Sequence, residues 1–177
     1  MTDTLLTVGH GRAGPDELPA LLAAAGVELV VDIRRFPGSR ASPHLARDAL
    51  ADRLPRDGVA YRWEERLGGR RSLPRDVPSP DTWWTVPAFR AYAGYTRTPE
   101  FRTALAELLG EAARLRVSVM CSESVWWRCH RRLVADVAVL AHGVDVQHLM
   151  PDGSLRPHRP AEGARLTDDG ELVWDGA

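Results

Sequence analysis

The chain has 177 residues, enough for one domain with a sizeable core, and its formal net charge is −1. This balance excludes a global positive field that would attract nucleic acid or a membrane surface, so any anion binding has to be local. The N-terminal residues lack the basic and apolar segments of a signal peptide, and no apolar stretch is long enough to span a bilayer. We therefore expect a cytoplasmic protein that does not bind membranes, with its two cysteines reduced.

The first part of the chain reads as strand, helix, strand. Residues 5–8 form an apolar run that ends at residues 9–12, where two glycines allow a sharp turn or a close approach to a ligand. A first-position proline and two first-turn acids precede an apolar stripe, which predicts a helix over residues 15–25. Residues 27–33 are nearly all apolar, as is typical of a strand covered on both faces. Polar residues follow both strands: His10 and Arg12 after the first, and Arg34 and Arg35 after the second.

The middle of the chain is expected to contain a weak helix, a third strand and a long connection. The helix covers residues 45–54 and the strand residues 59–63. The proline-rich connection over residues 64–87 is longer than compact domains usually tolerate without a function. Its tryptophans favour a lid, because a disordered segment has little use for large aromatic side chains.

Two further helices frame a central strand. A short helix is expected over residues 89–95, and Thr98-Pro99-Glu100 provides the cap, first-position proline and acid of a longer one. Residues 117–120 form an apolar run that reads as a buried strand, and a loop leads from it to a helix that begins near Trp127.

The last strand and the fold class follow from the remaining pattern. Residues 144–150 read as a strand, and residues 151–177 form a short, polar and irregular extension with a small hairpin at 172–174. Alternating strands and helices predict a single α/β domain over residues 1–150, with a mostly parallel sheet and helices on both faces in a Rossmann-like, three-layer arrangement.

This architecture predicts where chemistry can occur. In open parallel sheets ligands bind outside the carboxyl ends of the strands, so residues far apart in the sequence converge on one edge. We therefore expect a single pocket at that edge. The polar residues at the ends of the strands or just after them are His10, Arg12, Asp32, Arg34, Arg35, Glu64, Glu65, Cys121 and Glu123.

The segment over residues 117–132 contains both cysteines and most of the candidate chemistry. Arg128, Arg131 and Arg132 crowd the start of a helix, whose partial charge is already positive. Such a cluster indicates a site for an anion or a stabilised thiolate. We expect Cys121 to be the nucleophile or redox thiol, with Arg128 and Arg131 holding an anionic group; a buried, unreactive thiol is the structural alternative.

Three neighbouring residues complete the candidate machinery. His10 or His130 is expected to move protons, and Glu123 to orient an arginine or a histidine. Three roles are open for Cys129: it could resolve an oxidised Cys121, bind a metal or simply pack in the core. The sequence thus predicts a small anionic or sulfur-bearing substrate, without naming the reaction or a cofactor.

Two alternatives belong to other classes of protein. A transition metal such as zinc would accept a mixture of Cys121, Cys129, His130 and His10, although the tight cysteine pair of structural zinc sites is missing. Nucleic-acid binding would use arginines with Trp83, Trp84, Trp126 and Trp127, but the chain is not basic overall and shows no recognition motif.

Several ordered motifs resemble the DUF488 family. They are Thr7-Val8-Gly9-His10, Val31-Asp32-Ile33-Arg34-Arg35-Phe36-Pro37 with Ser39-Arg40, Leu67-Gly68-Gly69, Phe89-Arg90-x-Tyr92, and Cys121-x-Glu123 through Cys129-His130-Arg131. The resemblance covers about residues 5–150 and implies an α/β fold with an enzymatic or metal site at the two cysteines, but no defined reaction. Family members often have a proline before the second cysteine, where this chain has Val125-Trp126-Trp127.

A looser similarity connects the chain to rhodaneses and cysteine phosphatases. A strand that ends in a cysteine and continues through a loop into a helix is similar to their arrangement, and Arg128 follows Cys121 by seven positions. The chain lacks their glycine-rich loop. The similarity implies thiolate chemistry on an anionic or sulfur-bearing substrate.

Overall fold

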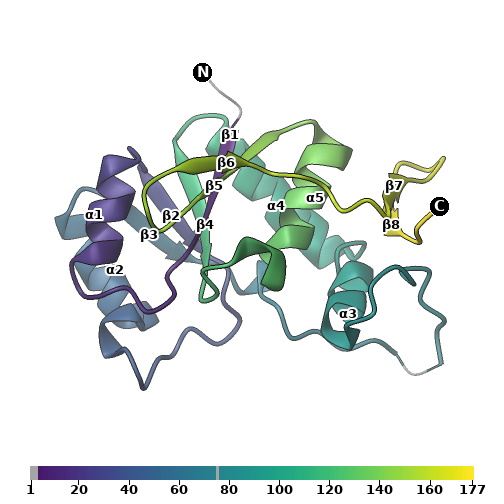
Figure 1. The fold of residues 1–177 in the computed structure, drawn as a ribbon, viewed down its shortest axis with the longest axis horizontal. Coiled ribbons are helices and arrows are strands. Elements are labelled where there is room, and N and C mark those ends of the chain that lie inside the picture. Colours follow the sequence, from purple (N-terminus) through teal and green to yellow (C-terminus); the bar gives the residue numbers. More distant parts are fainter. Residues whose placement is uncertain (1–3, 75) are drawn as a thin grey trace.

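A six-stranded sheet forms the centre of the computed structural model, which describes residues 4–74 and 76–177 (Figure 1). The strands are β1 (Thr4–Gly9), β2 (Leu29–Asp32), β3 (Ala60–Trp63), β4 (Val117–Cys121), β5 (Asp145–Leu149) and β6 (Leu155–Pro157), and a separate hairpin holds β7 (Ala164–Leu166) and β8 (Leu172–Trp174). The strand order is β3-β2-β4-β1-β5-β6. All neighbours pair in parallel except β6, which runs antiparallel to β5.

Helices cover both faces of this sheet, which confirms the predicted α/β fold. The α-helices are α1 (Glu17–Ala24), α2 (Arg47–Arg56), α3 (Pro87–Tyr95), α4 (Pro99–Ala112) and α5 (Arg131–His142), and short 3-10 helices are η1 (Pro43–Leu45), η2 (Glu65–Leu67) and η3 (Trp126–Arg128). Within the described residues, no helix combines the length and the apolar character that crossing a bilayer requires.

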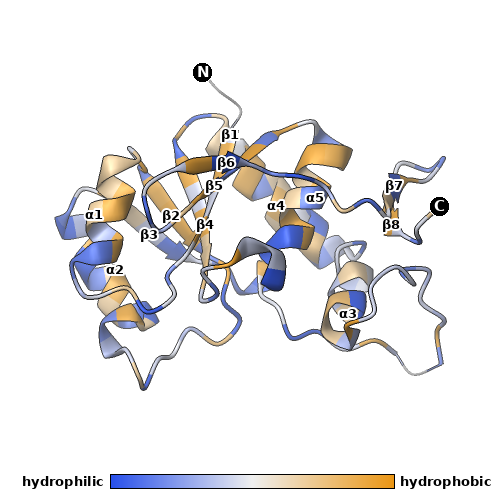
Figure 2. Cartoon of the chain, viewed as in Figure 1, coloured by the Kyte–Doolittle hydropathy of each residue, from blue (hydrophilic) through white to orange (hydrophobic). Residues whose placement is uncertain are grey.

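Two separate apolar clusters lie on the two faces of the sheet. One joins Leu22 of α1 and Leu54 of α2 to Val8 of β1. The other contains Leu105 of α4 and Leu133 of α5, together with the alternate residues of the same central strands. Figure 2 shows apolar residues concentrated in these strands and in the helices beside them. α1 and α5 therefore pack on opposite faces.

This arrangement fixes where the sheet can bind a ligand. β1 and β4 are neighbours, paired from Leu6 with Ser118 to Gly9 with Cys121. β1 leads into α1 on one face, whereas β4 leads into α5 on the other. Because ligands of open α/β sheets bind where the connections of adjacent strands diverge, the ends of β1 and β4 form the expected crevice.

The long connection over residues 64–87 is anchored by its own side chains. Trp84 is buried in the core beside α4 and α5. The buried carboxylate of Asp81 accepts two hydrogen bonds from the Arg97 guanidinium, at 3.0 and 2.6 Å, and one from the Trp174 backbone N–H at 3.1 Å. Packing against the core thus explains why this connection contains Trp83 and Trp84. The role of the connection as a lid stays a prediction.

The C-terminal extension is more structured than its sequence indicates. The hairpin predicted near residues 172–174 is confirmed as β7 and β8. β6 adds a strand to the sheet that the sequence did not predict, because Leu155-Arg156-Pro157 is short and exposed on every residue. The Trp174 side chain is fully buried, and its Nε1 donates to Asp136 of α5 at 2.8 Å. The extension therefore completes both the sheet and the core.

Candidate active site

A cavity of about 410 Å³ lies at the carboxyl ends of β1, β2 and β4. Several of the residues predicted from the sequence line it, and they come from four separate segments of the chain. They are His10, Arg34, Arg35, Cys121, Glu123, Arg128, Cys129 and His130. The structure thus brings these side chains together, while the roles assigned to them stay predictions.

Two of the predicted arginines lie outside this cavity. Arg12 is exposed beside a separate depression next to α1. Arg131 is 1% exposed, and its guanidinium donates to the carbonyl oxygens of Glu123 and Ser124, at 2.9 and 3.1 Å, and to Thr7 Oγ1 at 3.1 Å. Its position therefore suits holding the loop after β4 better than contacting a substrate.

The two cysteines meet at the floor of the cavity. Cys121 ends β4 and Cys129 precedes α5, and their sulfur atoms are 2.8 Å apart without forming a disulfide. The helix predicted to begin near Trp127 begins instead at Arg131, because η3 intervenes and Cys129 is extended, with φ −128° and ψ 153°. Trp126 of η3 stacks on His148 of β5 at 4.3 Å, which holds this bend in place.

The pKa values of the two thiols move in opposite directions. Burial, followed by the neighbouring sulfur, raises the pKa of Cys121 well above its usual value. Burial is also the largest influence on Cys129, but its hydrogen bond with Cys121 and the charge, backbone N–H and side chain of Arg131 outweigh it and lower the pKa of Cys129. The thiolate form is therefore more favoured at Cys129 than at Cys121.

His130 is placed to exchange a proton with Cys129. Its Nε2 lies 3.0 Å from the carbonyl oxygen of Ile33, so this nitrogen must carry the hydrogen and donate it. Nδ1 is then the acceptor, and it faces Cys129 Sγ at 3.4 Å. Burial lowers the pKa of His130, which keeps the imidazole neutral. A thiol within reach of a neutral imidazole nitrogen is the arrangement of an activated nucleophile.

Gly68 and Gly69 allow the connection after β3 to approach this centre. A Cβ atom on Gly69 would lie 3.1 Å from His130 Nδ1, and one on Gly68 would lie 2.8 Å from the backbone of Arg35. The Leu67-Gly68-Gly69 motif is thus a packing requirement of the cavity wall.

A buried ion pair forms the β2 side of the cavity. Arg34 donates from Nε and Nη2 to the two carboxylate oxygens of Asp32, at 2.8 and 2.6 Å. Asp32 is fully buried and also accepts the Tyr61 hydroxyl at 2.5 Å. The charge of Arg34 is therefore largely neutralised within the protein. The sequence placed Asp32 at this edge without giving it a role. Tyr61 was not predicted, because nothing in the sequence pairs it with Asp32, 29 positions earlier.

His10 also contacts the ion pair of Arg34 and Asp32, through a hydrogen bond from Arg34. Its Nδ1 lies 2.9 Å from the Gly11 carbonyl oxygen and donates to it, which leaves Nε2 as an acceptor for Arg34 Nη1 at 3.3 Å. Burial lowers the pKa of His10, so the ring is neutral. The lone pair that a general base would need is occupied, and His130 is the better placed of the two histidines.

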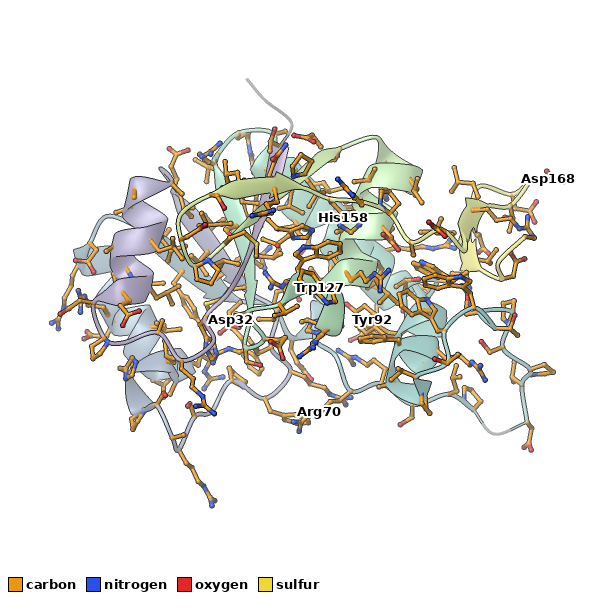
Figure 3. All side chains as sticks on the ribbon, viewed as in Figure 1. Asp32, Arg70, Tyr92, Trp127, His158 and Asp168 are labelled. Atoms are coloured by element: carbon orange, nitrogen blue, oxygen red, sulfur yellow. The ribbon has the colours of Figure 1, made fainter. Side chains whose placement is uncertain are left out.

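Free positive charge gathers at the mouth of the cavity. Arg128 and Arg70 are exposed, and neither has a carboxylate within ion-pair distance among the described residues. Arg70 has φ +57°, a left-handed conformation that costs energy outside glycine, and its guanidinium lies 5.5 Å from the Phe36 ring. Figure 3 shows Arg70 at the outer edge of the molecule. The sequence prediction missed Arg70, although it directly follows Gly68-Gly69.

The geometry does not favour the zinc alternative. Across residues 4–74 and 76–177, no group of three or more His, Cys, Asp or Glu side chains is arranged to hold a metal ion. His10 Nε2 faces the guanidinium of Arg34, and His130 Nε2 donates to a backbone carbonyl. A cation bound by the predicted ligands would have to lie against that guanidinium.

A buried chain of hydrogen bonds connects Arg131 to the C-terminal extension. Thr7 Oγ1, which accepts from Arg131, lies 2.5 Å from His148 Nδ1. His148 Nε2 lies 2.9 Å from His158 Nδ1, and His158 Nε2 lies 2.6 Å from Asp136 Oδ1. Because a guanidinium can only donate and a carboxylate accepts, each histidine donates through Nε2 towards Asp136. We call this set of five residues the Arg131–Asp136 chain.

Because of the Arg131–Asp136 chain, we expect the folded protein to lose stability in mild acid. Burial, with the charges of His158 and Arg131, lowers the pKa of His148 to about 2, whereas in the unfolded chain a histidine titrates near 6.5. Below about pH 6.5 the unfolded state therefore binds a proton that the folded state excludes, and the free energy of unfolding falls with pH. Between pH 7 and pH 5 this histidine contributes a loss of about 2 kcal/mol.

Urea unfolding of the wild type and of His148→Gln at both pH values measures this contribution. We expect the difference between the two pH values to be about 2 kcal/mol smaller in the variant. An equal difference in both proteins would show that His148 accepts a proton in the folded state.

Of the comparisons with known proteins, the scan against family models supports the resemblance stated from the sequence. A search of curated proteins and a search of solved structures each found no match to the chain. A family model described as "Domain of unknown function DUF488" matches residues 15–138, a segment that contains both cysteines, His130 and Arg131, while His148 and His158 lie beyond it. The match covers more than half of the chain, so the chain belongs to the DUF488 family.

Proposed function

We propose that the protein is an enzyme that uses the Cys129 thiolate to attack a small anionic or sulfur-bearing substrate in the strand-end cavity. The observation that carries the proposal is the position of Cys129 Sγ, 2.8 Å from Cys121 Sγ and 3.4 Å from His130 Nδ1. The sequence favoured Cys121 as the nucleophile. The proposal assigns that role to Cys129, because only its pKa is lowered.

Two residues next to Cys129, His130 and Arg131, contribute in different ways to forming its thiolate. His130 Nδ1 accepts the thiol proton, and the hydrogen bond from Nε2 to the Ile33 carbonyl holds the ring in the required tautomer. Arg131 supplies a nearby positive charge, and its Nε is buried with no other partner among the described residues. These contacts favour the thiolate of Cys129 relative to an ordinary thiol, which is almost entirely protonated at neutral pH.

The mouth of the cavity supports the choice of an anionic substrate. Arg128 and Arg70 present guanidinium groups that the described residues do not neutralise. Guanidinium groups bind carboxylates and phosphates through paired hydrogen bonds. Their place beside the thiols allows one end of a substrate to be held while the other end meets Cys129.

The nucleic-acid alternative is less well supported. Trp84 is buried in the core, and Trp126 stacks on His148. Trp83 packs edge-on against Trp84, and Trp127, although 48% exposed, packs edge-on against Trp126. These contacts leave little aromatic surface for stacking on bases. A reducing compartment such as the cytoplasm, where both thiols would stay reduced, fits the proposal.

Alkylation of single-cysteine variants tests the assignment. In Cys121→Ser the hydroxyl still donates to Cys129, so we expect Cys129 to react with iodoacetamide at pH 7 at least about tenfold faster than Cys121 does in Cys129→Ser. An ordinary thiol with a pKa of 8.5 is only about 3% thiolate at that pH. Mass spectrometry from pH 5 to pH 9 gives the rates and the midpoints. A midpoint at or above 8.5 in Cys121→Ser, or the reverse order of the two variants, would end the proposal.

A further inference from the structure

The two sulfurs lie close enough to bond to each other after a small movement. Their separation of 2.8 Å exceeds the length of a disulfide bond, about 2.05 Å, by less than 1 Å. Both cysteines are buried, so neither sulfur is readily available to a second protein molecule. The chain has only these two cysteines. An electrophile that captures one sulfur therefore has the other as its immediate neighbour.

We propose that Cys129 and Cys121 act as a dithiol that reduces small anionic disulfides, with Cys121 as the resolving thiol. This inference rests on the proposed function, since it requires Cys129 to be the nucleophile. It adds the substrate class and a second catalytic residue. An external dithiol has to reduce the resulting internal disulfide before the next turnover.

The first step forms a mixed disulfide. The Cys129 thiolate attacks one sulfur of R–S–S–R, so that a bond forms between this sulfur and Cys129 Sγ while the S–S bond of the substrate breaks. The leaving R–S⁻ takes the electron pair of that bond, and His130 passes the proton that it took from Cys129 to this group or to water, which restores the neutral imidazole. The negative charge beside Cys121 disappears at the same moment.

The loss of this charge prepares the second step. Burial raises the pKa of Cys121 most, the hydrogen bond with Cys129 and the negative charge of Cys129 raise it further, and the charge of Arg131 lowers it. Once Cys129 is in the mixed disulfide, only burial still opposes ionisation of Cys121. The Cys121 proton passes to the imidazole of His130, whose Nδ1 lies 3.4 Å from Cys129 Sγ, the immediate neighbour of Cys121 Sγ. Reaction of Cys129 with the substrate thus favours ionisation of Cys121.

Resolution completes a balanced two-electron reduction. Cys121 Sγ attacks Cys129 Sγ, the internal disulfide forms, and the bond from Cys129 to the substrate sulfur breaks. The second R–S⁻ leaves with that electron pair and takes up a proton. In sum, one disulfide and two protein thiols give two free thiols and one protein disulfide.

The cavity mouth defines the charge and shape of the substrate. Arg128 and Arg70 carry free positive charge, and the ring of Phe36 is 62% exposed, with the guanidinium groups of Arg35 and Arg70 each 5.5 Å from its centre. A cavity of about 410 Å³ accepts a small molecule and excludes a folded protein. Low-mass disulfides that carry carboxylates next to an apolar or planar group match these features.

Dithiobis(nitrobenzoate), an aromatic disulfide with two carboxylates, is the probe for this inference. We expect the reduced wild type to release two thionitrobenzoate ions per chain and to end as an internal disulfide without an adduct. Cys121→Ser is expected to release one ion and to keep the other as a stable mixed disulfide at Cys129. Absorbance counts the released ions, and mass spectrometry of the intact protein identifies the product.

The products separate the two proposals. A wild type that keeps one adduct, or carries an adduct on each cysteine, would overturn the dithiol mechanism while leaving Cys129 as the nucleophile. A wild type whose first adduct forms on Cys121, with Cys129→Ser reacting faster than Cys121→Ser, would overturn the proposed function as well.

A matched pair of probes tests the charge of the substrate. Arg128→Gln is expected to slow the reaction with dithiobis(nitrobenzoate) about fivefold, because it removes one local positive charge from the mouth. Dithiodipyridine, a disulfide without carboxylates, should react at the wild-type rate. An equal decrease in rate with both probes would contradict recognition of the carboxylates. An unchanged rate with both probes would show that Arg128 does not take part in binding the substrate.

Discussion

Replacing Asp136 by alanine is expected to lower the free energy of unfolding by about 3–5 kcal/mol. The carboxylate is fully buried on α5 and accepts three hydrogen bonds from the C-terminal extension: from His158 Nε2 at 2.6 Å, from Trp174 Nε1 at 2.8 Å and from the Ala161 backbone N–H at 3.2 Å. Alanine leaves these donors buried without an acceptor. Each such group costs about 1–3 kcal/mol.

Urea unfolding at pH 7 measures this effect against a matched control. Asp169→Ala removes an exposed carboxylate from the turn between β7 and β8 and is expected to change stability by less than about 0.5 kcal/mol. Asp136→Asn keeps the shape and one acceptor oxygen, so its loss should fall between the two. A loss below about 1 kcal/mol in Asp136→Ala would show that the extension does not depend on this carboxylate.

The same substitution also tests the link between the extension and the thiols. The Arg131–Asp136 chain ends on the guanidinium that lowers the pKa of Cys129. If Asp136→Asn remains folded, we expect slower alkylation of Cys129 than in the wild type, because the hydrogen-bond direction through His158 and His148 is no longer fixed. The site then depends on residues beyond the segment that the family model matches.

The fold could be predicted from the sequence where several residues indicate the same element. β1, β2 and β4 are apolar runs of several residues, and α4 combines an N-cap, a proline and a regular apolar stripe, so several residues indicate each of these elements. The convergence of strand ends followed from the parallel sheet alone. β6 and the buried Trp174 could not be predicted, because a three-residue strand and one aromatic residue carry no periodicity.

The candidate site was predicted in outline, but not in the division of roles. Reading Trp126 and Trp127 as the start of a helix placed Cys129 on its first turn, whereas stacking on His148 ends η3 early and leaves Cys129 extended ahead of α5. That change gives Cys129 the Arg131 backbone N–H. Arg131 itself is buried by contacts with backbone carbonyls, which no side-chain pattern encodes.

Gly9→Ala is expected to damage both the fold and the reactivity of Cys129. A Cβ atom at this position would lie 1.8 Å from the Glu123 carbonyl oxygen and 2.7 Å from Ser124 Cα. Both are backbone atoms, so the loop after β4 has to move as a whole. Overpacking of this kind costs about 1–3 kcal/mol and occasionally more, and we expect about 3 kcal/mol because the clash is with backbone on a buried strand.

The loop of Glu123 and Ser124, which packs against Gly9, also holds the Arg131 side chain in place. The carbonyl oxygens of Glu123 and Ser124 accept its guanidinium at 2.9 and 3.1 Å, so displacing them moves the charge that lowers the pKa of Cys129. A shift of one pKa unit towards the ordinary thiol value, the change we expect, slows alkylation at pH 7 by up to about tenfold.

Gly38→Ala provides the matched control for this last prediction. Gly38 also lines the cavity, but a Cβ atom there would have no neighbour within 4 Å, so stability and alkylation should stay close to those of the wild type. Urea unfolding and iodoacetamide kinetics on both variants distinguish a local clash from a general sensitivity of the cavity wall. If Gly9→Ala were as stable and as reactive as Gly38→Ala, the close contact between β1 and the Glu123–Ser124 loop could not be what positions Arg131. The thiolate would then have to owe its low pKa to the Cys121 hydrogen bond and the start of α5 alone.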